Sequence, residues 1–512
     1  VKYDVLSLTL AKKEWPKIQE TLGKRYRYAI KRIKQSESED VFQILMNSFA
    51  RVVEPHTSYL SPKNAERFQM EMNLSLEGIG AVLRAEEDYT VIQSVVTGGP
   101  ADKSKQLGPK DRIVGVAQGK EEFVDVVGWR LDDVVDLIKG PKGTQVRLQI
   151  QSGESDSDAN IKVVSIIRDT IKLEDRAAKS EIYFEQTSQG DPRKLGVINI
   201  PSFYNNLSRD VKKEIAKLKA DNVEGIIIDL RGNGGGSLTE ATLLTGLFID
   251  KGPVVQVLNQ KKHVEVQRDL DGVTFYDGPL TVMVDRYSAS ASEIFAAALQ
   301  DYDRALIVGE STFGKGTVQQ HKSLGRIYDM YDKPIGHVQY TIAKFYRING
   351  GSTQLKGVTP DIPFPSALEP GEYGEAEEDN ALPWDKVPVA QYGTLGDINS
   401  NLISHLDSQH QKRIKKDVEF GYIYQDIAEF KKSHNETSVS LVEKERIAER
   451  ETNDSKQLAR LNERRAAEGL AVYATLDDAD EDVTAPDAFL DETVYITLDM
   501  VDLDKLAKNQ SQ

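Results

Sequence analysis

Three serines stand where a nucleophile could work, in the stretch "YSASASE" at 287–293. Ser288, Ser290 and Ser292 alternate with alanines directly before a predicted helix, "IFAAALQ". A serine at a helix N-terminus has backbone N–H groups and a positive dipole end beside it, and both can stabilise a developing oxyanion. A serine is also an ordinary helix N-cap. The pattern alone therefore leaves open whether one of the three is a nucleophile, and which one.

A lysine in "GESTFGKGT" (309–317) is the second group that could take part in catalysis. The glycine spacing resembles the start of a phosphate-binding loop, but that loop needs Ser or Thr after the lysine, and Gly316 stands there. The alternative is that Lys315 accepts a proton. Its pKa must then fall from about 10.4 toward 7, which costs roughly 4–5 kcal/mol. Because nothing acidic occurs between Glu310 and Asp329, we expect an apolar site away from carboxylates.

A run of glycines and one histidine complete the candidate chemistry. Gly234, Gly235 and Gly236 in "RGNGGG" favour unusual backbone dihedrals. They form either a plain strand-to-helix turn or a backbone N–H donor that faces a substrate carbonyl. Histidine is the most common partner of a serine nucleophile, and His321 is the histidine nearest these loops in sequence.

The elements before these loops are predicted to be buried strands. Continuous apolar runs occur at 223–230, 279–284 and 304–310, each followed by one of the three loops. Such runs are typical of strands buried on both faces of an α/β sheet. Ligand sites in these sheets lie at strand ends, so we expect the three loops at one sheet edge.

The rest of the chain divides into regions that differ in composition and in hydrophobic pattern. Residues 1–70 are charged and helix-prone, and 71–167 contain short strand-like runs with one helix at 130–140. An acidic linker follows 366, and the region after it is charged and helical. We interpret that region as an accessory helical domain, with a partner-binding surface as the alternative.

Composition narrows the class of protein. The 512 residues include 65 basic and 81 acidic residues, for a net charge of −16, without a basic stripe for nucleic acid. No window approaches 18 apolar residues, and the absence of cysteine excludes disulfides and thiolate sites and is consistent with an oxidising compartment. The chain starts at Val1 without a signal peptide, so we expect the signal segment to be absent from it.

Taken together, the loops resemble those of the C-terminal processing (tail-specific) serine peptidases, which combine a Ser–Lys dyad with a PDZ domain. The matching segments, in this order, are "EPHTSYLSP", "SLEGIGAVL", "GWRLDDVVDLIKGPKG", "IIIDLRGNGGG", "DRYSASASEIFAAALQDYDRA", "GESTFGKGTVQQ", "FYRINGGSTQLKGVTPDI", "EDNALPWD" and "FLDETV". The set is specific to the family, although no single segment is.

The resemblance assigns roles to individual residues. It implies that Ser290 is the nucleophile, Lys315 the general base and Gln319 the side chain that orients the lysine. The oxyanion donors would be the backbone N–H groups of Gly236 and Ala291. A family acid matches Asp301, which we interpret as structural.

The fold implied is multidomain α+β: an α/β peptidase core of the crotonase (Clp-like) type, an inserted PDZ domain and helical N- and C-terminal regions. The expected domains are a helical region at 1–70, the PDZ domain at 71–167, the peptidase core at 168–365 and a helical domain at 366–512.

The PDZ domain would bind a peptide as an added strand. Residues expected at its groove are Gly78, Ile79 and Gly80 in the carboxylate-binding loop, and Leu131, Val134, Val135 and Ile138 on the helix; for the last four, an ordinary core role is the alternative. Glu77 precedes Gly78 where many PDZ domains have a basic residue upstream, so backbone amides alone would hold a terminal carboxylate.

The expected function is therefore a serine endopeptidase for proteins with apolar C-terminal tails, without metal or other cofactor. The resemblance implies a periplasmic enzyme of a Gram-negative bacterium. It leaves room for an adaptor protein and for peripheral membrane attachment, and no nucleic-acid partner is expected. The rival hypotheses are a PDZ scaffold or holdase with an inactive peptidase core, a Ser–His hydrolase that uses His321, and a nucleotide-binding protein.

Overall fold

The computed structural model describes residues 1–152, 161–185, 192–325, 335–369, 371–434, 436–479 and 485–510. The chain forms two compact units. One combines Val1–Ser36 with Ile414–Asp491, and the other combines Glu37–Arg413 with Glu492–Gln512. The mixed α+β architecture with helical terminal regions, expected from the sequence, is confirmed.

The first unit is helical and draws on both ends of the chain. Leu8, Ile18 and Leu22 form a small buried core between its first two helices. Arg464 donates two hydrogen bonds of 2.7 Å to Glu419 and so joins two of the later helices. The elements are α1 (Lys2–Leu10), α2 (Trp15–Lys34), α11 (Val418–Ser433), α12 (Glu443–Ala467) and the 3₁₀ turn η3 (Leu476–Asp478).

The second unit contains a six-stranded sheet in the order β10-β11-β12-β15-β16-β19. All neighbouring strands are parallel except β10 and β11. The strands are β10 (Lys179–Glu185), β11 (Arg193–Asn199), β12 (Gly225–Asp229), β15 (Leu280–Val284), β16 (Leu306–Gly309) and β19 (Ile362–Pro363). The helices are α7 (Leu207–Ala220), α8 (Leu238–Gly246) and α9 (Ala291–Asp301).

Strands β12, β15 and β16 are neighbours, and every residue in them is buried. Their continuous apolar sequences therefore predicted them correctly. Because parallel neighbours end at the same sheet edge, the glycine loop, the serine loop and the lysine loop leave the sheet on one side. This part of the sequence prediction is confirmed.

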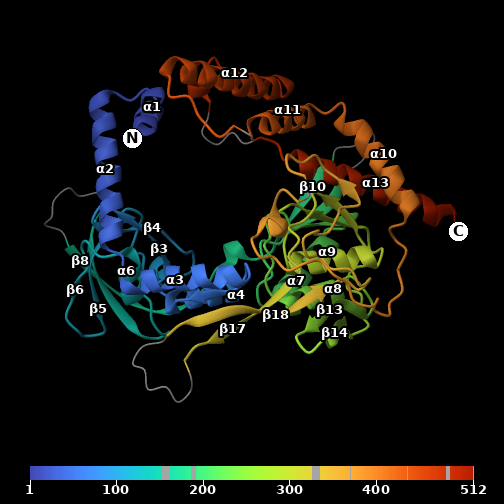
Figure 1. Cartoon of the computed structure of the whole chain (residues 1–512), viewed down its shortest axis with the longest axis horizontal. Coiled ribbons are helices and arrows are strands. Elements are labelled where there is room, and N and C mark those ends of the chain that lie inside the picture. Colours follow the sequence, from blue (N-terminus) through green and yellow to red (C-terminus); the bar gives the residue numbers. More distant parts are fainter. Residues whose placement is uncertain are drawn as a thin grey trace. The chain divides into compact units, whose positions relative to one another are not determined.

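A second sheet continues from the lysine loop. It consists of β1 (Ser58–Leu60), β13 (Gly252–Asn259), β14 (Val264–Asp269), β17 (Thr317–Ser323) and β18 (His337–Tyr346). Strand β17 pairs with β18 as a long antiparallel ribbon, and β1 pairs with β18, with Ser58 opposite Gln339 (Figure 1). Helices α3 (Ser38–Val53) and α4 (Pro62–Asn73) flank β1 in sequence. The pairing brings the segment before β1 to the strands that carry the lysine loop.

The region expected to be a PDZ domain forms a sheet in the order β3-β4-β5-β7-β8, with β6 beside β5. Strands β2 (Ser75–Gly78) and β9 (Asp169–Lys172) pair with each other at its entry and exit. The predicted helix is α6 (Leu131–Ile138). The other elements are β3 (Ala81–Glu86), β4 (Tyr89–Val95), α5 (Pro100–Ser104), β5 (Arg112–Gln118), β6 (Val124–Asp125), β7 (Gln145–Gln151), β8 (Ile161–Ile167) and the 3₁₀ turn η1 (Glu174–Arg176).

Two helices from the later part of the chain are tied to the second unit by buried polar contacts. Glu492 of α13 (Ala488–Gln510) accepts hydrogen bonds from Arg413 and lies 3.0 Å from the ring of His410 in α10 (Ser400–Ile414). The hydroxyl of Thr497 in α13 lies 2.8 Å from that of Thr281 in β15. A 3₁₀ turn, η2 (Gly374–Glu377), precedes them.

Candidate active site

One cavity brings the predicted chemical groups together. Its volume is about 430 Å³, and it opens between the three loops and strand β17. Its lining includes Gly236, Ser290, Ala291, Lys315, Gln319 and His321.

Of the three serines, only Ser290 lines this cavity in the part of the chain that the structure describes. Ser288 and Ser292 are 0% exposed. The Ser288 hydroxyl donates to the Leu230 carbonyl at 2.8 Å, and the Ser292 hydroxyl donates to the Asn233 carbonyl at 2.9 Å. These two hydroxyls therefore hold the serine loop against the glycine loop, and the half-buried Ser290 is the member of the trio that lines the cavity. The sequence alone did not separate them.

The backbone of Ser290 has φ 56° and ψ −109°, a conformation that side chains other than glycine rarely adopt. It lies at the junction between β15 and the N-terminus of α9. A sharp, strained turn of this kind exposes a serine hydroxyl in front of a helix N-terminus. Ala291, the first residue of α9, also lines the cavity.

Two backbone N–H groups beside Ser290 lack protein acceptors. Phe203 bonds to Gly235 and Ser237 on either side of Gly236, and Ala291 is the first residue of α9. Within the described residues, neither the N–H of Gly236 nor that of Ala291 donates to another protein group. Gly236 has φ 143°, and a Cβ there would lie 2.4 Å from the Phe203 carbonyl oxygen. Glycine is thus required at this position.

Glu293 holds the serine loop and the lysine loop together. One carboxylate oxygen accepts the N–H of Ser290 at 2.8 Å and that of Lys315 at 2.9 Å. The other accepts the Thr312 hydroxyl at 2.6 Å and the N–H of Gly314 at 2.8 Å. Burial raises the pKa of Glu293 to about 7, although these donors act in the opposite direction. A carboxylate thus occupies the backbone donors that a phosphate would need in a nucleotide-binding loop.

Burial lowers the pKa of the Lys315 ammonium below its ordinary value, as a general base requires. The expectation that the lysine lies away from carboxylates was wrong. Three carboxylates act to raise its pKa in part: Glu375, Glu293 and Glu54. Glu54 and Glu375 are remote in sequence from the lysine loop, and Glu293 lies in the first turn of α9, so the sequence around Lys315 did not show them.

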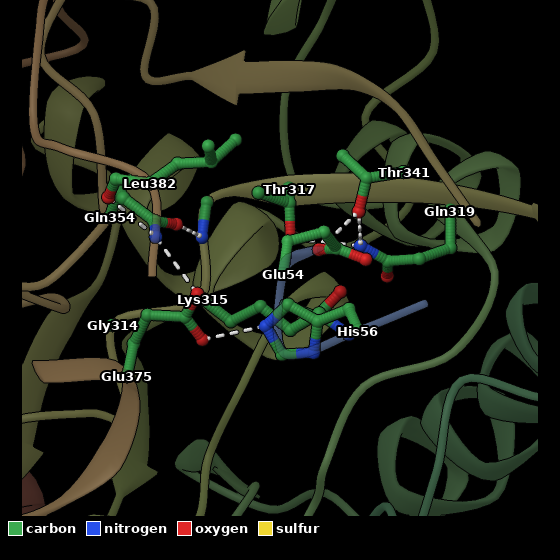
Figure 2. Close-up of polar contacts among 12 residues, drawn as sticks. Glu54, His56, Gly314, Lys315, Thr317, Gln319, Thr341, Gln354, Glu375 and Leu382 are labelled. Carbon is green, nitrogen blue, oxygen red and sulfur yellow. Dashed lines mark hydrogen bonds and ion pairs between the residues drawn. The ribbon is translucent and has the colours of Figure 1, made fainter. Parts of the chain in front are cut away.

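Two groups of polar contacts support the lysine loop (Figure 2). In the first, the Gln319 amide donates to the Thr317 hydroxyl at 2.8 Å and to the Thr341 hydroxyl at 3.1 Å. Thr341 in turn donates to Glu54 at 2.9 Å.

In the second group, the N–H of Gly316 donates to the side-chain oxygen of Gln354 at 2.8 Å. Gln354 donates to Glu375, which lies 2.8 Å from the ring of His56 (Figure 2). Both groups include a residue from "EPHTSYLSP", namely Glu54 or His56. Sequence reasoning quoted that segment but gave it no role.

His321 lines the same cavity but faces an aromatic ring. It stacks on Phe68 of α4, with ring centroids 3.9 Å apart and an interplanar angle of 18°. Burial, followed by the neighbouring His337, lowers the pKa of its imidazole. Asp301 forms an ion pair with Arg347 at 2.6 Å and accepts from Asn349 at 2.7 Å. These partners are those of a structural carboxylate.

The predicted groove residues differ in burial. Gly78, Ile79 and Gly80 are buried at the junction between β2 and β3. On α6, Val134 and Ile138 are 0% and 3% exposed and belong to the core of this region. Leu131 and Val135 are half-buried, as is Leu137, and so keep part of their surface uncovered. The Glu77 carboxylate accepts from the N–H of Lys142.

In the described part of the chain, no three His, Asp or Glu side chains gather as metal ligands. No helix there carries an apolar stretch long enough to cross a bilayer.

Solved structures with similar coordinates include two processing proteases. The photosystem II D1 C-terminal processing protease is 24% identical, with a TM-score of 0.36, over 70% of this chain and 88% of that one. A peptide-bound PDZ domain of the carboxy-terminal protease of Vibrio cholerae is 62% identical, with a TM-score of 0.19, over 20% of this chain and 100% of that one.

Family models cover most of the chain. The tail-specific protease N-terminal domain matches residues 1–63, the PDZ domain 67–151, peptidase family S41 194–364, and the C-terminal domain of tail-specific protease 368–502.

Curated relatives agree with the family models. The tail-specific protease of Haemophilus influenzae is 48% identical over 503 residues, which are 98% of this chain and 71% of that protein. A probable CtpA-like serine protease of Staphylococcus aureus is 30% identical over 64% of this chain and 61% of that protein. The chain therefore belongs to the tail-specific proteases, serine-type peptidases of family S41 that carry a PDZ domain.

Proposed function

We propose that the chain is a serine endopeptidase with a Ser–Lys dyad. Ser290 is the nucleophile, Lys315 the general base and Gln319 the residue that orients the lysine. The N–H groups of Gly236 and Ala291 form the oxyanion hole.

One observation carries the proposal: Ser290, the serine of the trio that lines the cavity, shares it with a lysine whose pKa is lowered by burial. The same cavity is lined by Gly236 and Ala291, whose backbone N–H groups have no acceptor among the residues that the structure describes. A nucleophile, a base and preorganised oxyanion donors are the parts that acyl transfer needs.

The reaction follows from these positions. Neutral Lys315 takes the hydroxyl proton of Ser290 as the Ser290 oxygen attacks the substrate carbonyl carbon. The negative charge on the carbonyl oxygen is stabilised by the two backbone N–H groups. The lysine ammonium then gives its proton to the leaving amine, which departs as the peptide bond breaks and an acyl-enzyme ester forms. Lys315 then takes a proton from water as the water oxygen attacks the ester carbonyl carbon. It returns that proton to the Ser290 oxygen as the ester bond breaks, which releases the acid product and restores the neutral lysine.

The PDZ domain selects substrates by apolar C-terminal tails. Strand β3 lies at the edge of its sheet in the described chain, beside α6. An added peptide strand can pair with β3 and place apolar side chains against Leu131 and Val135 of α6. Membership in the tail-specific family supports this role, a periplasmic location in a Gram-negative bacterium and room for an adaptor.

Hydrolysis of an unfolded protein with an apolar tail tests the dyad. Ser290→Ala and Lys315→Ala abolish cleavage, whereas both variants still bind the tail peptide. Ser292→Ala is the matched control: it loses a buried hydrogen bond of about 1 kcal/mol but keeps the hydroxyl of Ser290, so it still cleaves. Activity in Ser290→Ala contradicts the proposal.

The rival base gives the opposite pattern. A Ser–His enzyme would lose activity in His321→Ala and keep it in Lys315→Ala. We expect His321→Ala to retain most of its cleavage, because the imidazole stacks on Phe68. A folded wild-type chain that binds the tail but never cleaves would instead indicate a PDZ scaffold.

The tail itself is tested with one substrate made with and without it. Removal of the tail should raise KM at least tenfold and leave kcat little changed. The tail binds away from the reacting bond and equally in the ground state and the transition state, and such binding affects KM alone. Equal kcat/KM for both substrates excludes tail selection.

A further inference from the structure

Glu54 is a buried carboxylate with no part in the proposed reaction. Its side chain lies directly after α3, and the residue is 8% exposed. One oxygen accepts the Thr341 hydroxyl at 2.9 Å. The other is buried and, within the described residues, has no hydrogen-bond partner. Because most buried polar atoms in folded proteins have a hydrogen-bond partner, the half-satisfied Glu54 is a candidate for a role beyond packing.

The contact with Thr341 fixes the direction of a hydrogen-bond chain. A carboxylate only accepts, so the single hydroxyl proton of Thr341 must point at Glu54. The Thr341 oxygen can then only accept on its other side, where the side-chain nitrogen of Gln319 lies at 3.1 Å. The acceptor at the end of the chain thus decides which end of the Gln319 amide faces Thr341 (Figure 2).

The orientation of that amide bears directly on the lysine. Both N–H groups of Gln319 are used, one by Thr341 and one by the Thr317 hydroxyl at 2.8 Å. Within the described residues the amide oxygen has no hydrogen-bond partner, and Gln319 and Lys315 line the same cavity. An oxygen accepts from an ammonium or amine N–H, whereas a flipped amide would present N–H donors to a lysine that has no acceptor once protonated.

We propose that Glu54 is a positioning residue for the peptidase reaction, which acts through Thr341 to hold the Gln319 amide oxygen toward Lys315. The inference rests on the proposed roles of Lys315 and Gln319. The inference gives a function to the segment between α3 and β1. The pairing of β1 brings this segment to β18, and its Glu54 then determines which groups donate and which accept in the hydrogen bonds from Thr341 to Gln319.

The hydroxyl of Thr341 gives the sharpest test, because Val has the same shape without it. In the full chain, Thr341→Val should lower kcat about tenfold, with KM changed less than about twofold, because the lost contact acts on the chemical step and not on tail binding. Thr341→Ser keeps the hydroxyl and should recover most of that loss. Thr281→Val removes a buried hydroxyl from β15, away from the cavity, and is the matched control for folding. Thermal midpoints and tail-peptide binding show that each variant is folded.

A double-mutant cycle tests whether Glu54 acts through Gln319. The amide of Glu54→Gln can donate to the Thr341 hydroxyl, so the Thr341 proton is no longer forced to point away from Gln319. This change alone should lower kcat about tenfold. In a Gln319→Ala background the same change should cost less than about twofold, because nothing remains to be oriented.

Three results overturn the inference: Thr341→Val with the kcat of Thr281→Val, Thr341→Ser as impaired as Thr341→Val, or equal losses from Glu54→Gln in both backgrounds. Failure of the dyad itself is seen separately, as activity in Lys315→Ala or Ser290→Ala in the same assay.

Discussion

Lys315 destabilises the folded state, and the direction of its pKa shift shows at which pH values it does so. Its folded pKa lies below its unfolded value of 10.5 because burial disfavours the ammonium. Between those two values the unfolded chain binds more protons than the folded chain, so stability rises with pH in that window. Below the folded pKa the destabilisation is fully present, and it is relieved as pH rises toward 10.5.

Replacement of this lysine by an uncharged side chain of similar length should therefore stabilise the fold. Lys315→Met is expected to be inactive but to melt at a higher temperature than the wild type at pH 7. The difference should shrink as pH approaches 10.5. Thermal unfolding between pH 6 and pH 10.5 measures it, with Lys322→Met, an exposed lysine on β17, as the control. A lower melting temperature for Lys315→Met at pH 7 would contradict the argument.

Glu293 is the residue on which the geometry of both loops depends. Each of its oxygens accepts two donors, so in Glu293→Gln one pair of donors must face an NH₂ group. We expect a loss of about 1–3 kcal/mol in stability and a fall in kcat of at least about tenfold, with little change in KM.

Glu240 provides the control for Glu293→Gln. It is also a buried carboxylate that accepts backbone N–H groups, those of Asn206 and Ser208 at the start of α7. Glu240→Gln should lose similar stability without the loss of kcat. If both variants lose kcat to the same extent, Glu293 acts only through stability.

At the level of elements, the sequence predicted those strands and helices whose residue pattern reflects their own burial. Strands β12, β15 and β16 have continuous apolar runs because both faces are buried, and the helix α6 has its apolar residues at helical spacing. The supports of Lys315 could not be predicted in this way. Thr341 and Glu54 are 287 residues apart, and His56 and Glu375 are 319 apart. The pairing of β1 with β18, strands far apart in sequence, brings Glu54 beside Thr341. The "S-x-x-E" spacing of Ser290 and Glu293, a capping-box pattern, was a local signal that could have pointed to Glu293.

The half-buried side chains of α6 should serve tail recognition, whereas its fully buried side chains should serve folding. Leu131→Ser and Val135→Ser remove half-buried apolar contacts, each worth up to about 1.5–3 kcal/mol when fully covered. Each should weaken tail-peptide binding about tenfold and raise KM for tailed substrates only. Asp132→Ser, at an exposed position on the same helix, is the control. Binding assays and cleavage of tailed and tail-free substrates check the prediction, and unchanged affinity in both apolar variants would place the tail elsewhere.

For the molecule as a whole, the net charge of −16 sets a long-range field that any substrate chain meets before contact. Charge of one sign over a protein raises the encounter rate with oppositely charged partners and lowers it with like-charged ones. The effect reaches about 30 Å at 0.01 M salt and about 10 Å at 0.1 M. In the proposed mode of recognition the tail, with its terminal carboxylate, is the same in every tailed substrate, so a difference in the effect of this field comes from the body of the substrate.

Two unfolded substrates with the same apolar tail but opposite net charge should therefore be distinguished at low salt. At 0.01 M salt we expect the basic substrate to have a kcat/KM about tenfold higher than the acidic one. Above about 0.3 M salt the two values should converge, since screening removes the field but leaves the tail contacts. The difference should lie in kcat/KM and vanish in kcat at saturation, because the field changes encounter and not the chemical step. Equal values at low salt, or a preference that survives high salt, would show that short-range contacts with the substrate body, and not the field, govern selection.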